Sequence, residues 1–169
     1  MHKAVFVAVA LLVPQGVWAQ CSVGETEFAS CQIKGKKTQV SVCYTADVAT
    51  YRFGKRDAAP DLVLTVPIVR LDYWPWPGIG RDISESVSFA NNGYAYELSV
   101  GFERQFEGEP QSDGPRHFGQ LTVMQGNKIL SVMACQPETV SYTYGEGLVA
   151  AKAARGQEWD ANSQAWATR

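Results

Sequence analysis

Short segments with alternating polarity fill the chain from residue 27 to residue 136 and constrain its fold more than any other feature. In the clearest of them, 38–44, the large residues Val40, Val42 and Tyr44 alternate with polar or small ones. A period of two predicts a strand with one buried face. Because this pattern recurs along the region, the sequence predicts an all-β fold.

Turn residues divide the region into about eight strands. The expected strands are 28–34, 38–44, 49–54, 62–66, 85–90, 94–102, 118–124 and 128–135. Asn92-Gly93 is the strongest hairpin signal, since both positions tolerate a positive φ, and Gly126-Asn127 marks a second hairpin. Short connections are typical of an antiparallel meander, which closes into a small barrel or folds into a two-sheet sandwich.

The first 19 residues read as a secretory signal. Lys3 precedes the apolar run 4–13, and Val17-Trp18-Ala19 fits a cleavage site after Ala19. Gln20 is not the small residue that a lipid-modified cysteine requires before it, so we expect a mature chain without a lipid anchor. No other apolar run approaches the roughly 18 residues of a membrane span. The expected domains are 1–19 (signal), 20–145 (β-barrel or sandwich) and 146–169 (tail).

The tail differs from the rest of the chain in composition. It is rich in alanine, and Trp159 and Trp166 are seven residues apart, a spacing that favours a helix. Gly156 interrupts the pattern. We expect one or two short helices on the outside of the sheet, or a disordered segment.

Four cysteines, Cys21, Cys31, Cys43 and Cys135, lie beyond the signal. In an oxidising compartment an even number predicts two disulfides, and a periplasmic or secreted protein. Spacing alone leaves three connectivities open. A closed meander brings the last strand beside the first, which favours Cys31–Cys135 and leaves Cys21 with Cys43. No C-x-x-C pair occurs, so no metal site is expected.

Catalytic motifs and cofactor motifs do not occur, and the chain is not expected to be an enzyme or to hold a cofactor. Its formal charge of −2 and pI of about 5.7 argue against a nucleic-acid partner. The loop 105–117 carries Glu107, Glu109 and Asp113. Glycan cleavage by these acids is an alternative, but a solvated loop does not hold carboxylates at a fixed separation.

The segment 71–81 is the most informative candidate site. It combines aromatic, apolar and cationic anchors with two prolines and two glycines that exclude regular structure; the anchors are Tyr73, Trp74, Trp76, Ile79 and Arg81. Such residues are favoured in binding surfaces. The alternative is that the rings form a plug over the open end of a barrel.

The layout of the chain resembles that of periplasmic lysozyme inhibitors and of other β-rich proteins exported by Gram-negative bacteria. The segments that carry this resemblance are 31–33, 36–43, 51–54, 76–81, 92–94 and Cys135. The inhibitors of c-type lysozymes carry Ser-Gly-x-x-Tyr and Thr-Lys-Gly stretches. Here Asn92-Gly93-Tyr94 stands alone, and no inhibitory residue carries over.

The resemblance implies an exported, non-catalytic binding module, an inhibitor or immunity-type protein that acts on an envelope enzyme. Its partner is then another envelope or secreted protein, met by the segment 71–81 together with Glu107, Glu109 and Asp113. The alternative is a lipocalin-like carrier that holds a small hydrophobic ligand in the barrel mouth.

Overall fold

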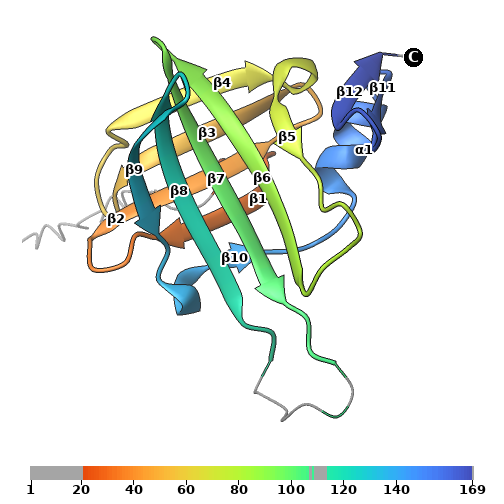
Figure 1. Ribbon diagram of the computed structural model, residues 1–169. Helices are drawn as coiled ribbons and strands as arrows, with labels where there is room; N and C mark the ends of the chain where they lie inside the picture. Colours follow the sequence, from red (N-terminus) through yellow and green to blue (C-terminus); the bar gives the residue numbers. More distant parts are fainter. Residues whose placement is uncertain (1–20, 107, 109–113, 169) are drawn as a thin grey trace, which may run out of the picture.

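The computed structural model describes residues 21–106, 108 and 114–168, and strands form most of its regular structure (Figure 1). The expected signal segment, 1–19, lies outside the described residues. The strands are β1 (Thr26–Gln32), β2 (Thr38–Tyr44), β3 (Val48–Lys55), β4 (Leu62–Pro67), β5 (Asp72–Trp74), β6 (Asp82–Asn91), β7 (Tyr94–Glu103), β8 (His117–Gln125), β9 (Lys128–Ala134), β10 (Ser141–Tyr142), β11 (Gln157–Asp160) and β12 (Ala165–Thr168). Among the described residues, the helical elements are η1 (Ile68–Arg70), η2 (Pro137–Thr139) and α1 (Gly147–Ala153).

Two five-stranded antiparallel sheets form the body of the molecule. The first has the order β10-β1-β2-β3-β4 and the second β5-β6-β7-β8-β9, while β11 and β12 form a separate hairpin. Figure 1 shows the second sheet crossing in front of the first. The all-β prediction is therefore confirmed. The single eight-stranded meander is wrong, because the twelve described strands belong to three sheets and none of these closes on itself.

The meander divides at the connection between β4 and β5. Pro67 ends β4, and its ring nitrogen has no N–H to donate to a neighbouring strand. The chain then turns through η1, which buries Ile68, and Ile68 N–H donates to Asp47 O at 2.9 Å. This corner redirects the chain into the second sheet.

At the other side of the molecule, the end of β9 meets the end of β1 through a single backbone bridge. After β9, Cys135 pairs with Ile33 as an isolated bridge, and Gln136 N–H donates to Gln32 O at 2.8 Å. Pro137 then opens η2 and takes the chain away before a ladder forms. β10 returns to pair with β1, where Tyr142 lies opposite Ala29.

The predicted hairpins are present. Asn92 and Gly93 both have positive φ, 49° and 82°, between β6 and β7. Gly126, with φ 55°, begins the turn between β8 and β9. Segment 71–81 differs from the prediction at its start, because Tyr73 pairs with Val87 and makes 72–74 a short strand that ends before Pro75.

Aromatic side chains join the inward faces of the two sheets. Tyr51 of β3 lies 5.6 Å from Phe89 of β6, measured between ring centroids, and Phe28 of β1 lies 6.1 Å from Tyr73 of β5. All four side chains are buried. The space between the sheets is thus occupied by large rings from both sides.

The tail contains one of the expected helices, α1, whose Leu148 packs into the core. A helix over the two tryptophans is wrong. Trp159 and Trp166 instead face each other as a pair across the β11–β12 hairpin. A seven-residue spacing also fits two strands joined by a four-residue turn, and Gln164 adopts a φ of 52° at its end.

Both expected disulfides are formed. Cys31 is bonded to Cys135 and joins the two sheets, while Cys21 is bonded to Cys43 at the start of the described chain. Two disulfides indicate an oxidising, extracytoplasmic environment. None of the described helices has the length and apolar character needed to span a membrane.

Candidate binding surface

The structure separates the predicted site residues into a buried and an exposed group. Tyr73 is only 1% exposed and belongs to the core. Trp74 and Ile79 are 43% and 75% exposed, and Arg81 is also exposed. Trp76 is half-buried between these groups. Segment 71–81 therefore both covers the core and presents side chains to solvent.

Rings and guanidinium groups gather around the exposed end of this segment. The Arg104 guanidinium lies 5.1 Å from the Trp76 ring centroid and 5.4 Å from that of Phe106. Arg81 lies 5.3 Å from the Phe106 ring, and Tyr144 packs edge-on against Trp76 at 5.9 Å. We call this set, which is Trp76, Ile79, Arg81, Arg104, Phe106 and Tyr144, the aromatic–arginine surface.

Backbone contacts fix the loop that carries this surface. Trp76 Nε1 donates to Ile79 O at 3.1 Å, and the Arg104 side chain donates to Gly80 O. Arg104 N–H also donates to Arg81 O at 3.1 Å. The end of β7 thus holds the irregular segment in place, and the rings are positioned before any partner arrives.

A buried carboxylate lies beneath the surface. Glu85, in the inward-facing row of β6, is 4% exposed. Tyr73 and Tyr142 donate their hydroxyls to it at 2.5 and 2.8 Å, and the backbone N–H of Trp76 also donates to it. Because these donors come from β5, the following loop and β10, Glu85 ties together the segments that present Trp76 and Tyr144.

Burial controls the ionisation of this cluster. Desolvation raises the pKa of Glu85 above its ordinary value, although the hydrogen bonds from Tyr73, Tyr142 and Trp76 act in the opposite direction. Desolvation and the nearby Glu85 carboxyl raise the pKa of both tyrosines. The hydroxyls therefore stay protonated as donors, and the cluster is suited to positioning the loop.

The C-terminal hairpin covers the other side of segment 71–81. Trp166 stacks on Tyr73 at 5.8 Å and its Nε1 donates to Tyr73 O at 2.7 Å. Trp74 packs edge-on against Trp159 at 5.8 Å. Figure 1 shows α1 and the β11–β12 hairpin together beside β5. Trp74 therefore belongs to an aromatic contact with the tail.

Part of the predicted site is not described. Glu107, Glu109 and Asp113 lie outside the described residues. The sequence interpretation also missed Glu85, Arg104, Phe106, Tyr142 and Tyr144. Only Glu85 had a readable signal, because it occupies the buried register of Ile83, Val87 and Phe89 in an alternating strand.

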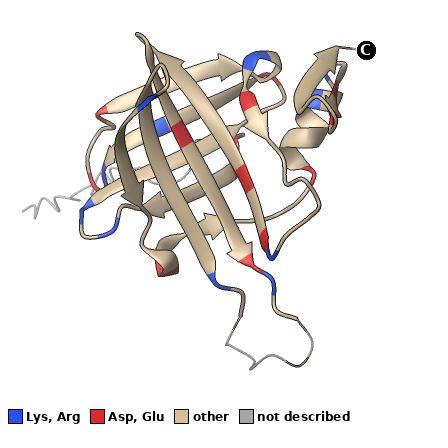
Figure 2. Cartoon of the chain, viewed as in Figure 1, with Lys and Arg blue, Asp and Glu red and all other residues tan. Residues whose placement is uncertain are grey.

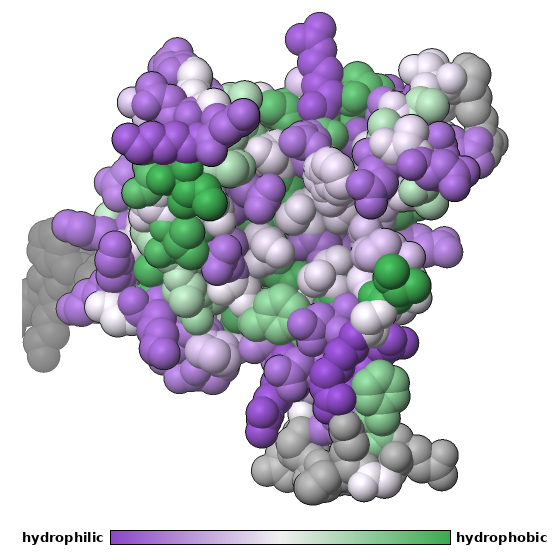
Figure 3. All heavy atoms as spheres, viewed as in Figure 1, coloured by the Kyte–Doolittle hydropathy of each residue, from purple (hydrophilic) through white to green (hydrophobic). Residues whose placement is uncertain are grey.

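A second exposed apolar patch lies on the edge strand β9. Its members Ile129, Leu130 and Val132 are 60%, 44% and 52% exposed, and apolar side chains gather over β9 in Figure 3. β9 ends the second sheet. This patch has no ring or guanidinium of the kind that dominates binding energies, so the aromatic–arginine surface is the better candidate.

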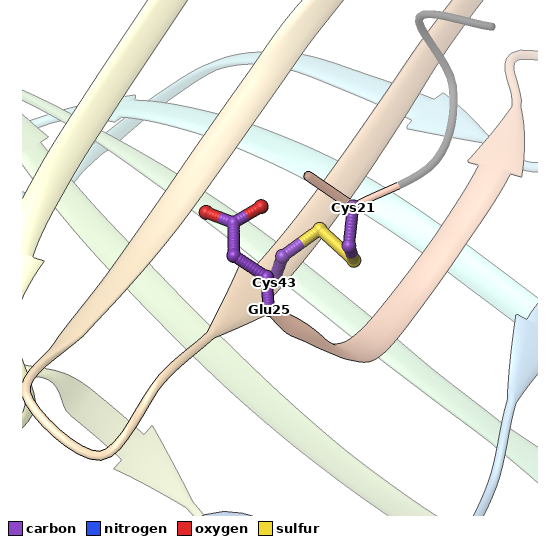
Figure 4. Close-up of side chains that lie close together, drawn as sticks. All are labelled: Cys21, Glu25 and Cys43. Carbon is purple, nitrogen blue, oxygen red and sulfur yellow. A yellow bond between two sulfur atoms is a disulfide. The ribbon is translucent and has the colours of Figure 1, made fainter. Parts of the chain in front are cut away.

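One group of potential metal ligands occurs among the described residues, namely Cys21, Glu25 and Cys43. Figure 4 shows the Glu25 side chain beside a disulfide that joins the two cysteines. A metal binds the thiolate form of cysteine, which Cys21 and Cys43 lack because they form a disulfide, so this group offers only the Glu25 carboxylate as a ligand. Glu25 itself pairs with Arg52 at 2.9 Å.

The resemblance to lysozyme inhibitors stays a prediction. Comparisons with protein-family models, with curated proteins and with solved structures gave no match.

Proposed function

We propose that this protein is a periplasmic or secreted, non-catalytic binding module that docks on another exported protein, an envelope enzyme, through the aromatic–arginine surface. The observation that carries the proposal is the cluster of Trp76, Arg104, Phe106 and Tyr144. Glu85 accepts hydrogen bonds from the Trp76 backbone and from Tyr142, two residues before Tyr144. Aromatic and arginine side chains supply most hot spots of protein interfaces. The two disulfides support an exported location.

Positioning of the rings supports binding. Side chains already fixed in one conformation lose less entropy when a partner docks, so more of the contact energy appears as affinity. The carrier alternative requires a hollow interior. Tyr51, Phe89 and Tyr73 occupy the space between the sheets, so this alternative gains no support.

The proposal is tested with a panel of purified muralytic enzymes, including lysozymes, titrated with the mature chain in a calorimeter. The expected result is a complex with one of them, together with loss of its activity. A Trp76→Ala/Phe106→Ala variant should weaken this complex at least about 30-fold, since two hot spots are removed.

A matched control uses the other exposed apolar patch. Leu130→Ala/Val132→Ala removes two apolar side chains from β9 and should leave the affinity within about twofold. Absence of a complex across the panel would exclude the proposed partner class. Equal losses in both double variants would show that the aromatic–arginine surface is not the docking site.

A further inference from the structure

Three adjoining hollows lie along strands β1, β2 and β3 of the first sheet. The largest, of about 410 Å³, is lined by Gln32, Lys37, Lys55 and Arg56 among others. The second, of about 250 Å³, shares Gln32 and Arg56 with it. The third, of about 20 Å³, shares Gln39 with the second and Lys55 with the first. Because they share walls, we treat them as one feature, the sheet-1 groove.

Lysine and arginine side chains line one end of the sheet-1 groove. Arg56 N–H donates to Lys37 O at 3.0 Å, and Thr38 pairs with Lys55, so the two turns that carry the cations are held side by side. Lys37, Lys55 and Arg56 are exposed, and none makes an ion pair within the part of the chain that the structure describes. They are therefore available to an anion.

Further positive charge extends this end. Lys34 and Lys36 belong to the turn that precedes Lys37, and Figure 2 shows Lys and Arg gathered at the turn joining β1 and β2. The whole chain carries a formal charge of −2. Asp57 and Glu27 also line the groove, so its charge is mixed but with cations in excess.

The floor of the groove offers hydrogen-bonding groups. Ser30, Ser141 and Gln39 line the second hollow. Gln39 Oε1 and Arg52 Nη1 are buried and have no partner among the described residues, and both residues line the smallest hollow. Its volume admits about one water-sized group, such as a hydroxyl. An acceptor and a donor without partners therefore belong to side chains in the wall of this hollow.

We propose that the sheet-1 groove binds an acidic saccharide. The carboxylates of the saccharide pair with Lys37, Lys55 and Arg56, and its hydroxyls bond to the amide and hydroxyl groups of the floor. The described lining offers no exposed ring on which a nucleic-acid base would stack. An extended peptide prefers a sheet edge, whereas the groove reaches the edge strand β10 only at Ser141 and otherwise runs across β1–β3.

The test titrates the mature chain with oligogalacturonate, a uronic-acid oligomer, and follows binding by calorimetry. The expected result is saturable binding that weakens as salt is added. Lys37→Glu/Arg56→Glu should weaken it at least about tenfold, since two attractive charges become repulsive. The control Arg70→Glu/Lys128→Glu changes the net charge equally, at exposed residues away from the groove, and should retain the affinity within about twofold.

Two comparison ligands separate a saccharide site from simple charge attraction. Polyglutamate of matched charge should bind at least about tenfold more weakly than oligogalacturonate, and neutral dextran more weakly still. Gln39→Met should weaken oligogalacturonate binding but not polyglutamate binding. Equal affinity for polyglutamate, no binding of oligogalacturonate, or full binding by Lys37→Glu/Arg56→Glu would each overturn the proposal.

This proposal is independent of the proposed function. Trp76→Ala/Phe106→Ala should bind oligogalacturonate like the unmodified chain, because neither residue lines the sheet-1 groove. Unchanged circular dichroism and urea midpoints in both charge-reversal variants verify that each is folded.

Discussion

Glu85 is the residue on which the arrangement of the candidate surface most depends. Glu85→Leu leaves the hydroxyls of Tyr73 and Tyr142 and the N–H of Trp76 without their acceptor in a buried site. Each unsatisfied buried donor costs about 1–3 kcal/mol, partly offset here because a desolvated carboxylate is removed. We expect a loss of about 2–4 kcal/mol in the free energy of unfolding, measured with urea.

A triple variant separates lost hydrogen bonds from poor packing. Adding Tyr73→Phe and Tyr142→Phe to Glu85→Leu removes the orphaned hydroxyls and should recover most of the lost stability. If the triple variant is as unstable as Glu85→Leu alone, the hydrogen-bond explanation is wrong.

The raised pKa of Glu85 also predicts a pH dependence. Burial keeps a proton on the folded protein at pH values where the unfolded chain, with an ordinary pKa of 4.5, has released it. The free energy of unfolding should therefore fall as the pH rises from about 4.5 through the folded pKa. Urea unfolding of Glu85→Gln should show this dependence reduced.

Glu97 provides the control for this measurement. Burial, with the nearby Asp72, raises its pKa too, so Glu97→Gln should remove a separate part of the slope and leave the Glu85 part in place. The same slope in Glu85→Gln as in the unmodified chain would contradict the assignment.

Lys152 joins the helix α1 and the β11–β12 hairpin to η1, the corner between the two sheets. This buried side chain donates to Ile68 O at 3.0 Å and to Gln157 Oε1 at 3.1 Å, and lies 4.9 Å from the Trp166 ring centroid. Burial lowers the pKa of Lys152 to about 8, although the nearby Asp72 acts in the opposite direction. The folded protein therefore releases this proton more easily than the unfolded chain does.

The consequence is a second pH dependence of opposite sign. The Lys152 contribution to the free energy of unfolding should rise with pH between about 8 and the ordinary lysine pKa of 10.5, because the unfolded lysine binds more protons there. The raised pKa values of Tyr73 and Tyr142 lower the free energy of unfolding as the pH approaches the ordinary tyrosine value of 10.0, so the Lys152 contribution is the difference between the unmodified chain and Lys152→Met. Lys152→Met should abolish the rise and cost about 1–3 kcal/mol through the unpaired Ile68 carbonyl. Tryptophan fluorescence during urea unfolding measures both, and an identical pH dependence in Lys152→Met and in the unmodified chain would contradict the assignment.

The sequence predicted correctly those elements whose conformation is determined by neighbouring residues alone. Asn92-Gly93 set a hairpin because its backbone preference needs no distant contact. Trp159 and Trp166 led to a wrong prediction of a helix, because a spacing of seven residues fits both a helix and a short hairpin. The packing of Trp166 on Tyr73 favours the hairpin. The aromatic–arginine surface likewise depends on contacts between Trp76, Arg104 and Tyr144, which are distant in sequence.

The disulfide pairing was predicted correctly although the closed meander behind it is wrong. The chain after β9 crosses to Ile33 for a single bridge, and this is enough to bring Cys135 to Cys31. Gly119 leaves room there, since a Cβ atom at this position would lie 2.7 Å from the Cys135 sulfur. The Cys31–Cys135 bond requires only that these two chain segments lie close together, and no closed barrel is needed.

The two disulfides should differ in their contribution to the stability of the whole molecule. Cys31–Cys135 links residues 104 positions apart and joins the two sheets, whereas Cys21–Cys43 links residues 22 apart. A longer closed loop restricts the unfolded chain more, by about 4.7 kcal/mol for 100 residues against about 3 kcal/mol for 15. Cys31→Ala/Cys135→Ala should therefore be the less stable of the two double variants in urea.

Packing adds to the difference between these variants. Cys31 and Cys135 are both buried, so their replacement by alanine also leaves a small cavity, whereas in the other disulfide Cys43 is buried and Cys21 is partly exposed. We expect the gap in the free energy of unfolding to exceed about 1.5 kcal/mol. Equal stabilities, or a less stable Cys21→Ala/Cys43→Ala variant, would show that neither the longer loop nor the link between the sheets makes Cys31–Cys135 the larger contributor.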